Sequence, residues 1–158
     1  MNISTISTMI AEQDKYKLII SEKVETTIRT ICSHIHKEEW SGILFYSVEG
    51  SLENKDLVLT AEDILLMHKG TAGFTEFTID EDVAFHIAMN DLAELKMGLI
   101  HSHNNMTAYF SGTDQNTLKI LGEKQIHFLS LIINNEGKYV ARLTRKESTV
   151  IESEVHIK

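Results

Sequence analysis

The feature that most constrains the fold is the alternation of short apolar runs with segments of helical periodicity. The runs at residues 16–20, 41–48 and 96–100 have strand length, and none approaches the roughly 20 apolar residues of a membrane-spanning helix. After Ser21 the apolar residues recur at steps of three and four, which predicts a helix with Ser21 as its N-cap. Short strands separated by helices predict an α/β or α+β fold with a mixed sheet.

Turn-forming and helix-capping residues bound the remaining expected elements. The first of these are a strand at 55–67 after a turn at Gly50–Asn54, a glycine-rich loop at 69–78, and a helix at about 81–94. Asp80 caps this helix, and Val83, Ile87 and Leu95 point inward. A helix from near Asp114 to Leu121, a hairpin over 126–145 turning at Asn134–Gly137, and a last strand in 148–157 follow.

Length and composition favour one globular domain. No repeat or linker divides the 158 residues, so we assign 1–15 to an N-terminal extension and 16–158 to a single domain. The one cysteine, Cys32, excludes an internal disulfide. It lies in the apolar stripe of the first expected helix, so we expect a buried structural thiol rather than a nucleophile.

The charge and the N-terminal residues exclude several function classes. A formal net charge of -8 argues against a general nucleic-acid binder, because phosphate neutralisation needs clustered Lys and Arg. The first 15 residues lack the basic region and long apolar core of a signal peptide. We therefore expect a cytoplasmic protein with neither a nucleic-acid nor a membrane partner; the oligomeric state is not specified by the sequence.

Two histidines, a serine and an aspartate lie close together in "GLIHSHNNMTAYFSGTD", residues 98–114. Side chains alternate along a strand, so His101 and His103 project to one side while Ser102 faces away. Asp114 can join them if the loop folds back and a helix begins there, where the helix dipole favours a carboxylate. Imidazole nitrogens and a carboxylate oxygen suit zinc, and three protein ligands leave a fourth position for water. We therefore predict one Zn²⁺ ion held by these three residues rather than a pair of solvated histidines.

A catalytic zinc site also needs a group that exchanges protons with water and with a leaving amine. No spare carboxylate lies within the ligand segment itself, so this group must come from elsewhere in the chain. Glu39, at the junction of the first helix and the next strand, is the candidate general acid/base, and Glu38 competes with it. Ser111 has no neighbouring base, so we assign it a hydrogen-bonding role as an oxyanion stabiliser.

The whole pattern resembles the signature of a known family. It reads Glu39, then His101-x-His103, seven residues, Ser111, two residues and Asp114. This is similar to the JAMM/MPN+ (JAB domain) zinc metalloprotease family, with a distant Glu followed by H-[S/T]-H-x7-S-x2-D. The segment "EWSGIL" resembles the family's E-x-x-G-[IL]-L, and this spacing favours Glu39 over Glu38. The resemblance extends from about Tyr16 to Arg145.

The resemblance implies a JAB/MPN-type mixed β-sheet flanked by helices, and it implies the roles just given for the three zinc ligands, Glu39 and Ser111. It further implies a zinc metallopeptidase that hydrolyses a peptide or isopeptide bond in a protein or peptide substrate such as a ubiquitin-like conjugate. An alternative of another class is a JAB-fold interaction or scaffold module of a larger assembly, a phage assembly included, whose metal is non-catalytic. A RadC-like JAB protein associated with DNA is disfavoured by the acidic charge and the missing "PSG".

Two segments depart from the family pattern or extend it. Asn104 stands where many members have proline, which bears on the rigidity of the loop. Residues 69–82 correspond to an insertion that clamps the substrate tail in the family, and Thr75–Thr78 offers a strand for pairing with an extended peptide. Tyr109 and Phe110 either pack the ligand loop or line the site.

We expect structural or solvent-exposed roles, and no chemistry, for the other residues that could take part in a site. His34 and His36 are two positions apart and diverge on a helix, so we expect a solvated helix end. Trp40 is expected to be a packing residue, with the floor of a cleft as the alternative. The remaining histidines are given no role; they are His68, His86, His127 and His156.

Overall fold

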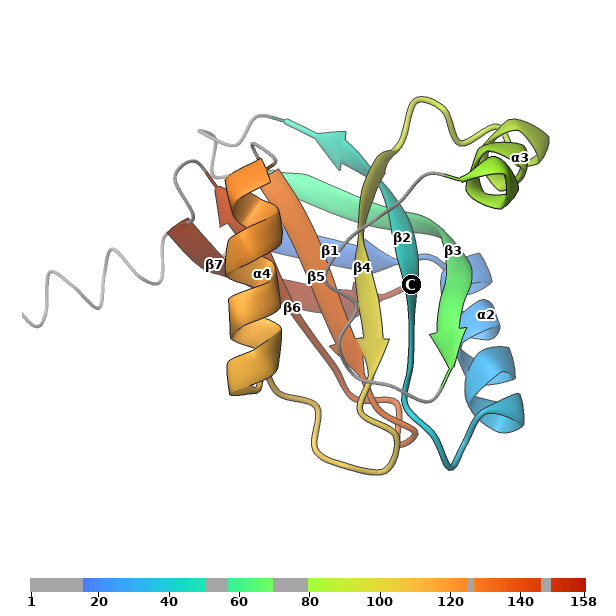
Figure 1. Ribbon diagram of the computed structural model, residues 1–158. Coiled ribbons are helices and arrows are strands. Elements are labelled where there is room, and N and C mark those ends of the chain that lie inside the picture. The colour runs from blue at the N-terminus through green and yellow to red at the C-terminus, as the bar shows by residue number, and fades with distance from the viewer. Residues whose placement is uncertain (1–15, 51–56, 70–79, 125–126, 146–148) are drawn as a thin grey trace, which may run out of the picture.

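The computed structural model describes residues 16–50, 57–69, 80–124, 127–145 and 149–158. Within these ranges seven strands and three helices are found (Figure 1). In chain order they are β1 (Tyr16–Ile20), α2 (Glu22–His34), β2 (Trp40–Glu49), β3 (Val58–Lys69), α3 (Glu81–Met89), β4 (Lys96–Ser102), α4 (Gly112–Lys124), β5 (His127–Ile133), β6 (Tyr139–Arg145) and β7 (Thr149–Ile157). The expected extension at 1–15, most of the turn at Gly50–Asn54 and most of the loop at 69–78, including Thr75–Thr78, lie outside the described residues.

The seven strands form a closed barrel in the order β1-β3-β2-β4-β5-β6-β7. The β1–β3, β1–β7 and β4–β5 pairs are parallel, and the others are antiparallel. The presence of both parallel and antiparallel pairs confirms the mixed sheet of the expected α+β fold. Helices pack on the mixed sheet as expected, but the sheet needs one correction, because it closes on itself through β1 and β7 and forms a barrel. Local sequence patterns carry no information about a pairing between strands so far apart in the chain.

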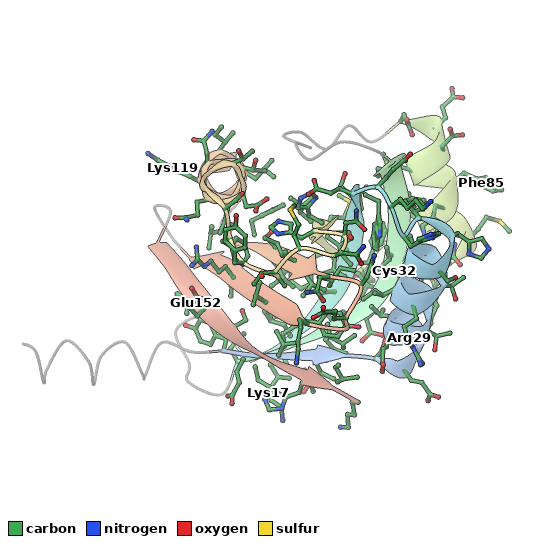
Figure 2. All side chains as sticks on the ribbon, turned by 90° about the horizontal axis from the view of Figure 1, so that it is seen from below. Lys17, Arg29, Cys32, Phe85, Lys119 and Glu152 are labelled. Atoms are coloured by element: carbon green, nitrogen blue, oxygen red, sulfur yellow. The ribbon has the colours of Figure 1, made fainter. Side chains whose placement is uncertain are left out.

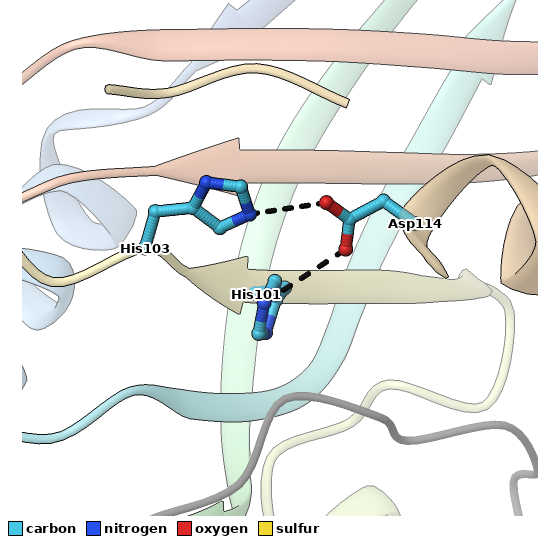
Figure 3. A group of neighbouring side chains, drawn as sticks. All are labelled: His101, His103 and Asp114. Atoms are coloured by element: carbon cyan, nitrogen blue, oxygen red, sulfur yellow. Dashed lines mark hydrogen bonds and ion pairs between the residues drawn. The ribbon is translucent and has the colours of Figure 1, made fainter. Parts of the chain in front are cut away.

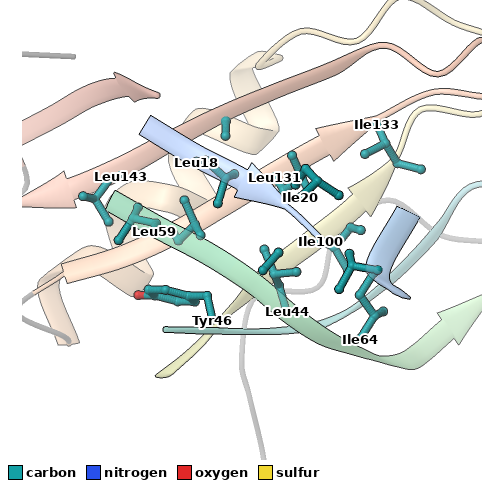
Figure 4. Packing of buried hydrophobic residues seen from close by; sticks show 14 of the residues in the cluster. Leu18, Ile20, Leu44, Tyr46, Leu59, Ile64, Ile100, Leu131, Ile133 and Leu143 are labelled. Atoms are coloured by element: carbon teal, nitrogen blue, oxygen red, sulfur yellow. The ribbon is translucent and has the colours of Figure 1, made fainter. Parts of the chain in front are cut away.

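Residues from all seven strands build the main hydrophobic core, and β1, β5 and β6 contribute alternate residues to it (Figure 4). Leu44 and Tyr46 of β2 and Ile100 of β4 lie in this core and are fully buried. The helix α2 adds Val24 and Ile28, as its apolar stripe predicted, and its Ser21 cap accepts a hydrogen bond from the Val24 N–H at 3.3 Å. The barrel interior is therefore a packed core rather than a ligand cavity.

The helices α3 and α4 cover the other face of the strands. Leu118 and Leu121 of α4 pack on outward-facing Leu99, Phe128 and Ile132 of β4 and β5. A separate cluster joins Val83 of α3 to β2; its buried members are Ile43, Phe45, Val83 and Leu92. Figure 2 shows Lys119 of α4 and Phe85 of α3 projecting away from the strands. None of the helices within the described ranges is both long and apolar enough to cross a membrane.

The helix α3 begins where the sequence predicted and ends earlier. The Asp80 carboxylate accepts a hydrogen bond from the Val83 N–H at 3.0 Å, so Asp80 is the N-cap. The helix ends at Met89 rather than at about residue 94, and Asp91 adopts a left-handed conformation with φ of 56°. Right-handed helical geometry cannot continue through such a residue. Leu95 therefore lies outside the helix, although it still packs against the α3 cluster.

A close approach of two backbones fixes the start of β2. The pairing register of β2 and β3 shifts between Ser41 and Gly42, which marks a bulge. A Cβ atom at Gly42 would overlap the Leu65 carbonyl oxygen of β3. Gly42 thus permits β3 to pass close to the first residues of β2, directly after the segment that carries Glu39.

Candidate metal centre

The end of β4 places both histidines of the His-x-His pair. His101 lies in β4 opposite Ser41 of β2 and on the same face of the strand as Leu99. His103 follows the strand directly, and its backbone N–H donates to the Ile133 carbonyl of β5 at 2.9 Å. The two residues are only 5% and 4% exposed. Backbone pairing on both sides of β4 therefore fixes two buried imidazoles next to each other.

Asp114 reaches the same point from the first turn of α4. The Ser111 N–H and hydroxyl both donate to Asp114 Oδ2, at 2.9 and 2.6 Å, while the Asp114 N–H donates to Ser111 Oγ at 3.2 Å. These reciprocal bonds cap the helix and hold the carboxylate toward the histidines (Figure 3). Asp114 Oδ2 lies 3.1 Å from His103 Nε2, and Oδ1 lies 3.8 Å from His101 Nε2.

The three side chains fit the requirements of a divalent metal. One ligand atom from each of His101, His103 and Asp114 can be chosen such that all three lie within 4.8 Å of one another. A tetrahedral zinc site with bonds of roughly 2.0–2.2 Å separates its ligand atoms by about 3.3–3.6 Å. The separations of 3.1 and 3.8 Å fall on either side of this range. The two separations involve different oxygens of the Asp114 carboxylate; two imidazole nitrogens and one carboxylate group this close suit zinc and leave a fourth position for another ligand.

Hydrogen bonds to the far side of each ring select the tautomer that binds metal. His103 Nδ1 lies 3.0 Å from the Thr107 carbonyl oxygen, which can only accept, so Nδ1 carries the proton. The His101 ring also hydrogen-bonds to the Trp40 main chain. The Nε2 atoms of both rings face Asp114, and His103 Nε2 contacts Oδ2 at 3.1 Å, so a metal ion bound there would replace this contact. Such bonds behind a ligating histidine orient the ring and fix its tautomer.

Burial controls the protonation of His101. It lowers the pKa of His101 below the ordinary value of 6.5, while the nearby Asp114 and Glu39 carboxylates act in the opposite direction. The lowered pKa favours the neutral imidazole at neutral pH. A neutral imidazole is the form that binds a metal ion.

The structure brings Glu39 to the three ligands although it lies far from them in sequence. Glu39 directly precedes β2, and its Oε2 lies 3.8 Å from His101 Nε2. Its side chain is 21% exposed, so the carboxylate also faces solvent. Glu38, the competing residue, is exposed. The position of Glu39 therefore agrees with the expected acid/base role, which stays a prediction.

Ser111 lies at the site but uses its hydroxyl on Asp114 at 2.6 Å. This contact gives it a role in holding a ligand, and donation to an oxyanion stays a prediction. Tyr109 is exposed and places its ring edge-on to His103 at 5.4 Å between centroids, whereas Phe110 is buried in the α4 cluster. One of the two aromatic residues thus borders the site and the other packs its loop.

Three further interpretations are settled by burial. Trp40 is fully buried in the main core, so it packs there and does not form the floor of a cleft. Cys32 is half-buried against the same core, and burial raises the pKa of its thiol. His34 and His36 are exposed, and α2 ends at His34, so His36 is not helical.

Sequence reasoning missed the partner of His86. This residue of α3 was given no role, yet its Nε2 lies 3.0 Å from Oδ2 of the buried Asp63 on β3. The Lys23 amine of α2 lies 3.4 Å from the other Asp63 oxygen. Asp63 thus connects two helices to β3. The available signal was the position of Asp63 directly before the apolar residues 64–67 of β3, because a buried carboxylate requires a partner.

The barrel carries a group of two histidines and one aspartate that could hold a metal ion, within an α+β fold. Residues 21–146 match the sequence profile of the prokaryotic homologs of the JAB domain, and the chain belongs to this family. The JAB-domain family includes metalloisopeptidases. The solution structure of a protein from Desulfitobacterium hafniense is similar, with a TM-score of 0.59 and 18% identity over 89% of this chain and 92% of that one. This likeness concerns the fold. No curated protein sequence matches this chain.

Proposed function

We propose that this chain is a zinc-dependent peptidase or isopeptidase. The observation that carries the proposal is the approach of Glu39 to within 3.8 Å of His101, beside three side chains that suit a zinc ion. A metal bound only for stability needs no carboxylate at this distance that is also open to solvent. Membership of a family that includes metalloisopeptidases supports the same function.

Bound zinc would supply a Lewis acid that lowers the pKa of water and polarises a substrate carbonyl. His101, His103 and Asp114 would hold the ion, with the His103 ring oriented by the Thr107 carbonyl and the His101 ring by the Trp40 main chain. Glu39 accepts a proton from the attacking water and delivers it to the amine nitrogen as the C–N bond breaks and the new C–O bond forms. Ser111 holds Asp114 in place through its hydroxyl, and its one hydroxyl proton would have to turn from Asp114 to the developing oxyanion to stabilise it.

The substrate that we propose is a protein or peptide, with the C-terminal tail of a ubiquitin-like protein as the first class to test. The ligand segment offers Tyr109, 54% exposed, and Met106, 57% exposed, next to the site. Exposed apolar side chains beside a metal centre suit a polypeptide better than a small charged molecule.

The test is hydrolysis by the purified full chain, loaded with zinc or treated with chelator. The panel contains linear fusions to ubiquitin-like tails, isopeptide-linked conjugates and cross-linked muropeptides, and products are identified by mass spectrometry. We expect cleavage of a C–N bond in at least one class, and only in the zinc-loaded protein. Zinc that binds and raises the melting temperature without cleavage of any panel member would instead support an interaction or scaffold module.

The Glu39→Gln variant tests the acid/base role. Glutamine keeps the shape of the side chain but cannot take up a proton, so we expect kcat to fall by about 10²–10⁴-fold. Zinc content should stay at the wild-type level. Glu38→Gln is the matched control, since it removes the same charge one residue earlier, and it should keep wild-type turnover. Wild-type activity in Glu39→Gln would show that the role is assigned to the wrong residue.

A further inference from the structure

Glu39 lies in a short segment that belongs to neither α2 nor β2. The helix ends at His34 and the strand begins at Trp40, so residues 35–39 are held by other contacts. Two asparagine side chains contact this segment. Asn104 donates its amide to the Lys37 carbonyl at 2.8 Å, and Asn135 donates to the His36 carbonyl at 2.9 Å.

The two asparagines come from the metal side of the site and bind each other. Asn104 follows the ligand His103, and Asn135 lies in the turn between β5 and β6. The Asn135 N–H donates to the Asn104 carbonyl at 2.7 Å, and its side-chain amide donates to Asn104 Oδ1 at 3.0 Å. We refer to Asn104 and Asn135 together as the asparagine clamp. The clamp connects the loop after His103 to the segment before Glu39.

The backbone at Asn104 explains why proline is absent here. Its φ is 60°, in the left-handed region that asparagine tolerates, whereas proline is fixed near -65°. The Asn104 N–H also donates to Ser102 Oγ at 3.0 Å, a bond that proline cannot make. This conformation allows the side-chain amide to reach Lys37. The loop is therefore held by hydrogen bonds, although it lacks the rigidity of a proline.

We infer that the asparagine clamp positions Glu39 over the ligands; the inference rests on the proposed function. The clamp bonds to the carbonyls of the two residues that lie three and two positions before Glu39. It is anchored next to His103 on one side and to the β5–β6 turn on the other. It thereby sets the gap between the Glu39 carboxylate and His101. Both asparagines are positioning residues, because neither contacts the reacting atoms.

The first measurement needs no substrate and no metal. Asn104→Gly removes the amide while glycine keeps the left-handed backbone without strain. In the metal-free full chain we expect amide hydrogen exchange of residues 36–40 to become on the order of 10-fold faster, since their local opening becomes easier. Exchange in β5 and β6 should stay unchanged. Glu136→Gln, an exposed position in the same turn, is the control and should leave all of these rates unchanged.

The second measurement asks whether the clamp acts through Glu39. In Asn104→Gly we expect kcat to fall on the order of 10-fold to 100-fold through misplacement of Glu39, with KM and zinc affinity kept. In a Glu39→Gln background the same substitution should cause no further loss, because residues that act as a unit are not additive. Asn135→Asp is a second variant. It keeps the shape of the side chain but replaces the donating amide with an oxygen that faces the His36 carbonyl and Asn104 Oδ1, both acceptors. It should show the same pattern.

Two outcomes would overturn the inference that the asparagine clamp positions Glu39. One is unchanged exchange at 36–40 in both variants, and the other is a loss of kcat that is equally large with and without Glu39. If the wild-type chain cleaves no panel substrate, the proposed function fails, and the exchange measurement alone decides whether the clamp holds the segment.

Discussion

At the scale of single residues, the candidate site depends on hydrogen bonds behind the ligands. The carbonyl of Thr107 lies 3.0 Å from His103 Nδ1, and the Trp40 main chain hydrogen-bonds to the His101 ring. The Ser111 hydroxyl fixes the Asp114 carboxylate at 2.6 Å. The three ligand atoms thus face one point before any ion arrives, which reduces the ordering that metal binding requires.

The lowered pKa of His101 predicts a pH dependence of stability in the metal-free protein. The folded state binds fewer protons than the unfolded state below pH 6.5, the ordinary pKa. The free energy of unfolding is therefore highest above that pH and decreases as the pH falls through the folded pKa. Urea unfolding with chelator at pH values of about 7.5 and 5.5 measures this decrease.

His101→Gln supplies the comparison for that experiment. Glutamine does not titrate, so the variant should lose less stability than the wild type between the two pH values. An equal loss in both proteins would show that other groups dominate and that burial of His101 has no measurable effect.

Short-range spacing made the proximity of His101, His103 and Asp114 predictable, whereas contacts between distant segments were not predictable. His101, His103 and Asp114 lie within one stretch of the sequence, and strand alternation plus a helix start brings them together. The partner of His86 is a carboxylate on β3, and the asparagine clamp joins the β5–β6 turn to the segment after α2. Such pairs depend on which strands become neighbours. A single sequence does not reveal this.

At the scale of secondary-structure elements, beginnings were more predictable than ends. Ser21 and Asp80 cap α2 and α3 with side-chain oxygens, a signal that is local and chemical. The end of α3 depends on the left-handed Asp91 and on packing of Leu92, which are consequences of the tertiary structure. The final strand β7 was anticipated from its alternation, but its parallel partner β1 was not.

The close approach of β3 at the bulge of β2 predicts that one methyl group added at Gly42 lowers the stability of the fold. In Gly42→Ala the new Cβ meets the Leu65 carbonyl oxygen of β3, which is backbone and cannot turn away. We expect the free energy of unfolding to fall by about 1–3 kcal/mol, as in overpacked cores. Chemical denaturation of the metal-free protein measures the change.

Gly112→Ala is the matched control for the bulge. No atom lies within 4 Å of a Cβ at this position, and Gly112 is the first residue of α4. The free energy of unfolding should stay unchanged or rise by roughly a few tenths of a kcal/mol, because alanine favours a helix more than glycine does. A loss as large as that of Gly42→Ala would mean that close approach is not the cause.

At the scale of the whole molecule, the proposed zinc site predicts that added zinc stabilises the folded chain. A ligand that binds only the folded state, at 100 times its Kd, stabilises that state by about 2.7 kcal/mol. For a chain of this size this corresponds to a rise in Tm of about 5–10 °C. Thermal unfolding with zinc and with chelator measures the difference. Asp114→Asn removes the ligand charge and should abolish most of the rise, whereas an equal rise in that variant would place the zinc elsewhere.

Closure of the barrel joins the two extremes of the described chain, since Tyr16 pairs with Ser153 and Ile20 with Ile157. Contacts between residues so distant along the chain are reached late, because a large loop must first lose its freedom. We therefore expect slow, all-or-none acquisition of the native state, and a nascent polypeptide still lacking β7 leaves β1 and β6 with unsatisfied edges. These edges can pair with another copy of the chain until the nine residues of β7 have been synthesised and have closed the barrel.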